Sequence, residues 1–329
     1  MGTKHSKILR RLLVLLGAAC VLLHGVGTIW AQPVTIQTVS VGNAGNAADS
    51  TGYGSVSYNY NIGKYDVTSS QYTAFLNAVA ATDTYSCYNS AMAGTNSGHP
   101  GIIQSGSSGG YSYSVTGGRD NNPVTDVSFW NAARFANWLA NGQPTATVEG
   151  VGTTETGTYT LTSDGMTNNT VTRNAGAGWA VASENEWYKA AYYTPLGGTG
   201  NSNPNYWLYP IQSNTISTSQ ANYGNVVGDT TAVGSYSYPS YYGTYDQGGN
   251  VFQWNESIYS GIGSDRGLRG GSFNGSDGSL QSVNYLIDDP TGAYDIYGFR
   301  VSQVPEPASF SILAFGMVGL LVRRRGVKR

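Results

Sequence analysis

Helix is confined to three short stretches of this sequence, and that scarcity is the strongest constraint on the fold. The stretches cover residues 69–81, 128–142 and 183–195. Each begins at or just after a residue typical of a helix N-cap, and two have the spacing of a capping box, Thr68 with Gln71 and Ser183 with Glu186. The first stretch also repeats apolar residues at the spacing of a buried helical face: Tyr72, Phe75, Leu76 and Val79.

The rest of the chain is rich in loop-forming residues. Short β-prone pieces such as 55–67 and 158–162 alternate with stretches of Gly, Ser, Asn and Thr. We expect the longest of these stretches, 105–118 and 152–178, to be surface loops or hairpins, because long structureless segments are rare in compact domains. The 25 tyrosines supply apolar area for a core, so the chain is not disordered. Few helices among short strands and loops predict an α+β fold.

Both ends of the chain have the layout of targeting segments. Basic residues precede an apolar run before Ala31, which is typical of a secretory signal peptide over residues 1–31. At the other end, Val304 is followed by Pro-Glu-Pro, an apolar run over 308–322 and three arginines. An uncleaved anchor is the alternative at each end. Fold reasoning therefore applies to residues 32–304, which is long enough for one large domain.

The C-terminal layout over 305–329 resembles the PEP-CTERM sorting signal of Gram-negative bacteria. That resemblance implies export, transient membrane contact through a short transmembrane run, and processing by an exosortase-type enzyme. The mature protein is then expected in the cell envelope or the extracellular matrix. Because most excess positive charge lies in the two ends, the central span is more acidic than the full-chain net charge of −2 suggests. An acidic surface repels phosphate backbones, so we expect no nucleic-acid partner.

Redox and transition-metal chemistry have few side chains to use. Cys20 lies in the signal segment, which leaves Cys87 without a disulfide partner, and His99 is the one histidine of the central span. The sequence therefore contains no His/Cys cluster suited to zinc, copper or iron. We interpret Cys87 as a structural or incidental thiol.

Seven segments, in order, resemble the formylglycine-generating enzyme (sulfatase-modifying factor) family. They cover residues 62–79, 122–139, 179–193, 221–236, 242–257, 266–273 and 297–302. The resemblance implies a C-type-lectin-like α+β fold. It also locates the two cysteines with which the enzyme binds copper and oxidises a substrate cysteine; these positions are Gly275 and Leu280 here. Neither residue can ligate copper, so we expect a non-catalytic module and no copper. The alternative is a copper-dependent oxidoreductase that generates formylglycine.

The same resemblance indicates residues for calcium. In the family an Asn–x–x–Glu turn helps to hold a structural calcium ion; Asn250 matches the asparagine, whereas Gln253 replaces the glutamate. Asn222 matches a second calcium site. Losing a charge weakens calcium binding, so these sites are expected to be weak or empty. The alternative for Asn250 is a structural role in a tight turn after Gly248 and Gly249.

The candidate ligand surface combines two segments. Residues after Arg269-Gly270-Gly271 line the substrate groove in the family, and here they are small and polar: Asn274, Ser276 and Asp277. The tyrosine-rich segment Tyr236–Tyr245 offers Tyr241 and Tyr242 for stacking on sugar rings. We expect an exopolysaccharide or surface-protein ligand, with packed loop tyrosines as the alternative. Arg269 is expected to pair with a buried acid or with carbonyl groups.

Overall fold

The computed structural model describes residues 33–304, except for 95–98, 146–147, 177, 201–203 and 260–263. The predicted signal peptide and sorting signal lie outside the described residues. Within this part of the chain, no helix is both long enough and apolar enough to cross a membrane.

Three of the helices lie where the capping residues predicted them. The α-helices are α2 (Ser69–Val79), α3 (Phe129–Ala140), α4 (Ser163–Thr167) and α5 (Glu184–Tyr192). Thr68 and Ser183 form reciprocal capping boxes, and the Ser128 side chain accepts a hydrogen bond from a backbone N–H in the first turn of α3. The caps fix these helix starts because they satisfy N–H groups that a helix end leaves free.

In the part of the chain that the structure describes, short strands form three small sheets. The strands are β1 (Thr38–Val41), β2 (Tyr60–Gly63), β3 (Ile102–Ser105), β4 (Ser112–Val115), β5 (Trp179–Val181), β6 (Phe252–Tyr259), β7 (Asp265–Arg269), β8 (Leu286–Asp288), β9 (Tyr297–Phe299) and β10 (Val301–Gln303). Their orders are β1-β2-β10-β5, β3-β4 and β8-β7-β6-β9. All strand pairs are antiparallel except β6 with β9. The first stretch expected to be a loop or hairpin, 105–118, contains the turn and the second strand of the β3–β4 hairpin, and the second, 152–178, contains α4.

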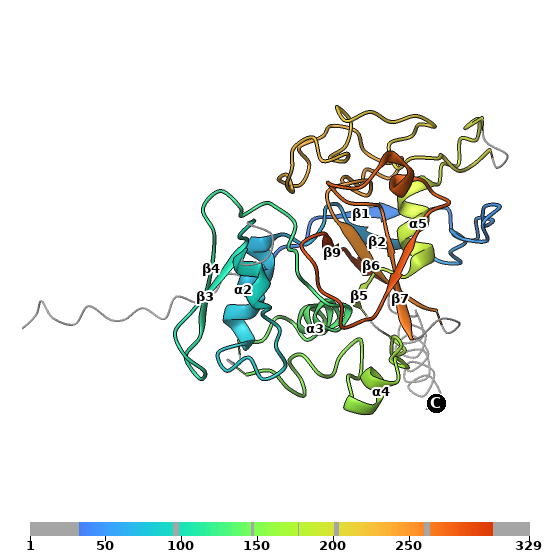
Figure 1. Ribbon diagram of the computed structural model, residues 1–329. Coiled ribbons are helices and arrows are strands. Elements are labelled where there is room, and N and C mark those ends of the chain that lie inside the picture. Colours follow the sequence, from blue (N-terminus) through green and yellow to red (C-terminus); the bar gives the residue numbers. More distant parts are fainter. Residues whose placement is uncertain are drawn as a thin grey trace, which may run out of the picture. The chain divides into compact units, whose positions relative to one another are not determined.

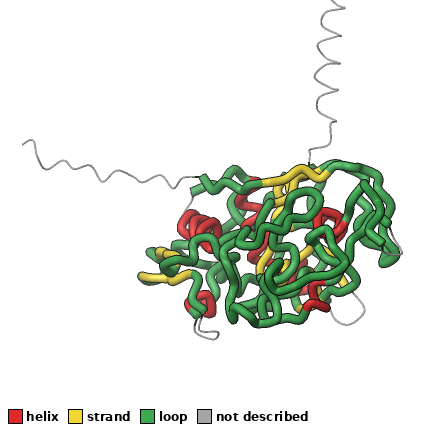
Figure 2. Tube along the Cα trace, turned by 90° about the horizontal axis from the view of Figure 1, so that it is seen from above, coloured by secondary structure: helices red, strands yellow, loops and turns green. Residues whose placement is uncertain are grey.

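Three of the helices pack against strands. In Figure 1, α2 lies against the β3–β4 hairpin and α3 beside β5, while α5 lies next to β6. The main core joins α2 and α3 through rings such as Tyr72, Phe75 and Phe135. Loops form most of the trace in Figure 2. The fold is therefore α+β with little regular secondary structure, as predicted.

Buried arginines hold these loops together. Arg269 lies 2.5 Å from Glu184 Oε1 and donates to the carbonyls of Ser282 and Asn284, which is the type of pairing expected for it. Arg300 is fully buried and donates to the carbonyls of Gly63 and Tyr245. Each guanidinium has several N–H groups in one plane, so one side chain joins several loop segments.

Candidate functional site

The two positions expected to carry cysteines in an active enzyme contain no donor atom. Leu280 ends the 3-10 helix η2 (Asp277–Leu280) and is completely buried. It forms a small apolar cluster with Tyr209, Ala221 and Tyr223. Gly275 precedes η2, and a Cβ atom added there would lie 2.7 Å from Ser279 Oγ. Because carbon and hydrogen do not ligate Cu(I), the side chains at 275 and 280 do not fit the copper of the enzyme.

The remaining cysteine of the described chain lies elsewhere. Cys87 is buried in the core of α2 and α3, which is distinct from the cluster of Leu280. Ligand atoms of Asp83, Cys87 and Glu149 lie within 4.8 Å of one another, a grouping that the sequence did not predict. Burial raises the pKa of Cys87 well above its ordinary value. A thiol that stays protonated is a poor nucleophile and a poor metal ligand, so this environment suits a structural role.

Three polar residues of the loop Gly271–Leu280 face solvent. Asn274, Ser276 and Asp277 are exposed. The loop is also well tied internally: the Ser272 hydroxyl donates to Asn274 Oδ1 at 2.8 Å, and Asp277 Oδ1 accepts from its neighbour's N–H at 2.9 Å. These groups can therefore offer hydroxyl and carboxylate oxygens to a polar ligand from an ordered loop.

The two candidate tyrosines are held differently. Tyr241 is 36% exposed, whereas Tyr242 is half-buried and donates to Asn43 Oδ1 at 2.9 Å. The Tyr242 ring stacks on Tyr193, with centroids 6.4 Å apart and planes 12° from parallel. Burial raises the pKa of Tyr242, so its hydroxyl stays protonated. Tyr241 thus presents an open ring, while Tyr242 has packing contacts of its own.

Both candidate segments contact the C-terminal end of α5. The hydroxyl of Tyr192, the last residue of α5, donates to the Leu280 carbonyl at 3.0 Å. Tyr193, the next residue, stacks on Tyr242. The chain therefore brings the loop Gly271–Leu280 and the tyrosine-rich segment to adjacent residues. We refer to Asn274, Ser276, Asp277, Tyr241 and Tyr242 together as the loop–tyrosine face.

The proposed calcium ligands divide into two groups. Asn222 Nδ2 donates to Asn250 Oδ1 at 3.1 Å, and Asn222 Oδ1 is buried without a hydrogen-bond partner among the described residues. An unpaired buried oxygen suits a cation ligand. Gln253 does not fit as well, because its Oε1 accepts from the Trp187 indole at 2.6 Å and from Arg300 at 3.1 Å. The structure therefore gives Gln253 a role in pairing a buried arginine, and calcium binding stays a prediction.

Asn250 also has the turn role that was its alternative. Its backbone is left-handed at φ 65°, and it follows Gly249 at φ 80°. A Cβ atom on Gly249 would lie 2.2 Å from the carbonyl oxygen of Asn222, so only glycine allows this close approach. The turn thereby places the Asn222 and Asn250 side chains side by side.

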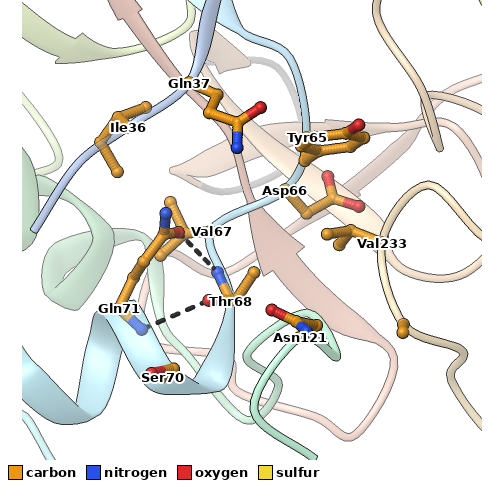
Figure 3. A pocket seen from close by; sticks show the side chains of 11 residues that line it. Ile36, Gln37, Tyr65, Asp66, Val67, Thr68, Ser70, Gln71, Asn121 and Val233 are labelled. Carbon is orange, nitrogen blue, oxygen red and sulfur yellow. Dashed lines mark hydrogen bonds between the residues drawn. The ribbon is translucent and has the colours of Figure 1, made fainter.

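Two cavities were not predicted from the sequence. The first, of about 340 Å³, lies between the residues before β1 and the β2–α2 connection, and the Thr68–Gln71 capping box lines it (Figure 3). Asp66 also lines this cavity; one of its oxygens pairs with Arg300 at 3.2 Å and the other has no partner among the described residues. Burial raises the pKa of Asp66 to about 8, although Arg300 opposes the rise. Asp66 can therefore hold a proton near neutral pH.

The second cavity, of about 460 Å³, lies at the start of α3. It combines residues from three loops that are distant in sequence, including Tyr85, Asp126 and Thr291. One local signal was available: because Ser128 was a predicted N-cap, the sequence predicted that Asp126 lies close to a helix start. Nothing in the sequence indicated which other segments would reach that point.

Comparisons with known proteins identify the domain. A model of the sulfatase-modifying factor enzyme 1-like domain matches residues 38–304. The chain belongs to the sulfatase-modifying factor family. The PEP-CTERM protein-sorting motif matches residues 303–325, which marks an exported bacterial protein of the cell envelope and implies processing by exosortase-type machinery. No curated protein sequence gave a significant match.

Solved structures of this fold show low sequence identity. Treponema denticola variable protein 1 is 20% identical with a TM-score of 0.54, and the match covers 84% of this chain and 97% of that one. CarF is 22% identical with a TM-score of 0.51, covering 82% and 99% respectively. These similarities establish the C-type-lectin-like fold of the family and no more than the fold.

Proposed function

We propose that this exported member of the sulfatase-modifying factor family is a non-catalytic binding module. The observation that carries the proposal is the replacement of the two cysteine positions by Gly275 and by a completely buried Leu280. Oxidation of a substrate thiol through copper needs thiolate ligands, and this loop offers hydroxyl, amide and carboxylate groups instead. The chain therefore keeps the frame of the enzyme without the side chains of its reaction.

The proposed ligand is a glycan or a protein of the cell surface, met at the loop–tyrosine face. The sorting motif supports the location, and we place the processed protein in the exopolysaccharide matrix of a Gram-negative bacterium. The exposed oxygens of Asn274, Ser276 and Asp277 suit hydroxyl groups, and the open ring of Tyr241 suits a sugar face. Aromatic contacts of this kind contribute about 1 kcal/mol beyond area burial.

Oxygen uptake tests the absence of catalysis. The full-length chain, supplied with copper and a cysteine-containing peptide, should consume oxygen no faster than a protein-free blank that contains the same copper and peptide. Cys87→Ser is the matched control, because it removes the remaining thiol of the described domain and should give the same rate. Turnover above the blank in the wild-type chain would show that the module is an enzyme.

Retention on host exopolysaccharide tests the ligand. The Tyr241→Ala/Tyr242→Ala variant should bind several-fold more weakly while its melting curve shows an intact fold. Equal binding by the double variant, or no binding by the wild-type chain, contradicts the glycan ligand and makes a surface protein the next candidate.

A further inference from the structure

The second cavity has the composition of a sugar site. Its volume of about 460 Å³ falls within the usual range for small-molecule sites, roughly 300–1,000 Å³. Both aromatic and hydrogen-bonding side chains line it: Tyr85, Tyr88, Trp130, Asp126, Asn131 and Arg134. The cavity draws none of its lining from the loop–tyrosine face, so it is a separate feature of the domain.

One buried donor in the cavity wall lacks an acceptor. Trp130 is only 5% exposed, and its indole N–H has no hydrogen-bond partner among the described residues. Buried N–H groups in folded proteins are nearly always paired, with protein, with water or with a ligand. The neighbouring Trp254 follows that rule, because its indole donates to the Val127 carbonyl at 2.9 Å. Trp130 and Trp207 therefore each keep an indole donor that the described residues leave unsatisfied.

The charges of the cavity disfavour an anionic occupant. Arg134 is already neutralised, because its guanidinium binds both oxygens of Glu155, at 2.7 and 3.1 Å. Asp126 is 5% exposed and lies near the start of α3, where the Thr125 hydroxyl is 3.2 Å from its Oδ2. The cavity thus contains a carboxylate acceptor without a spare positive charge, which suits neutral hydroxyl groups and repels uronic acids.

The aromatic wall completes the pattern. Tyr85 is 40% exposed, and Arg134 lies 4.9 Å from its ring centroid, which helps to hold the ring in place. The Tyr85 backbone N–H donates to Glu149 Oε2 at 2.9 Å, so the loop that carries the ring is also anchored. A fixed, partly open ring can stack on the apolar face of a pyranose with little loss of side-chain entropy.

We propose that this cavity binds a neutral pyranose unit of a polysaccharide. Asp126 accepts hydrogen bonds from its hydroxyl groups, and Tyr85 covers its apolar face. This site is independent of the loop–tyrosine face and gives the domain a second point of attachment to a glycan.

Affinity electrophoresis through gels that contain dextran, mannan or galactan tests the proposal on the full-length chain. At least one of these neutral polymers should retard the protein, and alginate, a polyuronate, should retard it less. Asp126→Asn keeps the side-chain size and tolerates the left-handed backbone at φ 58°. It should weaken binding about tenfold, because it removes a charge-assisted acceptor. Tyr85→Ala should weaken binding several-fold.

Two control variants separate the possible outcomes. Tyr58→Ala removes a tyrosine of similar exposure, 38%, outside the cavity and should bind like the wild type. When Asp126→Asn or Tyr85→Ala is introduced into the Tyr241→Ala/Tyr242→Ala chain, it should weaken polymer binding by the same factor as in the wild type. No retardation by any of the three neutral polymers, stronger retardation by alginate, or full affinity in Asp126→Asn overturns the cavity site. If Tyr241→Ala/Tyr242→Ala loses binding while neither cavity variant does, the cavity site is also overturned, and the loop–tyrosine face is left as the glycan site.

Discussion

The substitution Leu280→Ala tests whether position 280, which corresponds to a cysteine of the enzyme, is part of the core in this chain. The side chain is fully buried, and Leu280→Ala removes three carbon atoms from that environment. At about 0.8 kcal/mol for each buried methylene-sized group, the lost transfer free energy is about 2.4 kcal/mol. The cavity left behind adds to this value, because large-to-small substitutions are penalised beyond transfer.

The neighbours of Leu280 decide how much of that cavity stays open. A Cβ atom on Gly271 would lie 2.6 Å from Leu280 Cδ1, and one on Gly248 would lie 3.5 Å from Cδ2. Leu280 therefore packs against the backbone of two glycines, which have no side chain to move into the space. We expect the free energy of unfolding to fall by about 3–4 kcal/mol, within the range of about 2–5 kcal/mol seen for buried leucines.

Denaturant unfolding followed by tryptophan fluorescence measures this loss. The midpoint should fall while the slope m is unchanged, and Tm should drop by about 10 °C for a domain of this size. Val283→Ala is the matched control three residues later; that side chain is 53% exposed, so the expected change is within about 0.5 kcal/mol. A loss below about 1 kcal/mol in Leu280→Ala would mean that position 280 is open to solvent, as a reactive site requires.

Three further outcomes follow from the sequence and the structure. Intact-mass measurement of material from the native host should show a chain that begins near Gln32 and lacks the run after Pro-Glu-Pro; recovery of Arg329 would contradict processing. If calcium binds at Asn222 and Asn250, EDTA should lower Tm by several degrees, since a ligand at 100-fold excess over its Kd stabilises by about 2.7 kcal/mol; an unchanged melting curve would indicate no stabilising ion. Burial raises the pKa of Asp126 to about 6, so its ionisation costs stability as pH rises from about 4 to 6. Asp126→Asn should therefore stabilise the fold by about 2 kcal/mol at pH 7 and not at pH 3 in thermal unfolding, and an equal effect at both pH values would exclude this cause.

Local signals in the sequence predicted the helices and the fold class. Thr68, Ser128 and Ser183 each begin a helix because a cap acts within four residues of itself. Gly142, at the end of the expected stretch 128–142, also ends α3 as expected: it follows the C-cap Asn141 and is left-handed at φ 79°. The N–H groups of Gly142 and Gln143 donate to the carbonyls of Leu139 and Trp138, at 3.1 and 2.9 Å. No glycine follows α2, which ends at Val79, two residues before the end of its expected stretch.

The candidate sites could be predicted only where one segment carries them. The loop Gly271–Leu280 was found because its replaced cysteine positions lie in a single stretch of sequence. The second cavity was missed because Tyr85, Asp126 and Thr291 meet only after folding, and no periodicity relates them. Gln253 was expected near a metal because of its neighbour Asn250, yet it lies next to Arg300, a partner 47 residues away.

Side chains replace regular hydrogen bonding in this loop-rich fold, and this explains how its loops can be ordered. Asn137 Nδ2 donates to the carbonyls of Thr154 and Tyr159, and its Oδ1 accepts the Tyr159 N–H at 2.7 Å. The Arg266 guanidinium likewise donates to the carbonyls of Glu256 and Val171, at 2.8 and 2.7 Å. Buried loop carbonyls need such partners, because an unpaired one loses its hydrogen bonds to water without replacement. A loop fixed in this way has less conformational entropy to lose when a ligand binds. The same polar side chains that make the fold possible would therefore also lower the entropic cost of the binding proposed above.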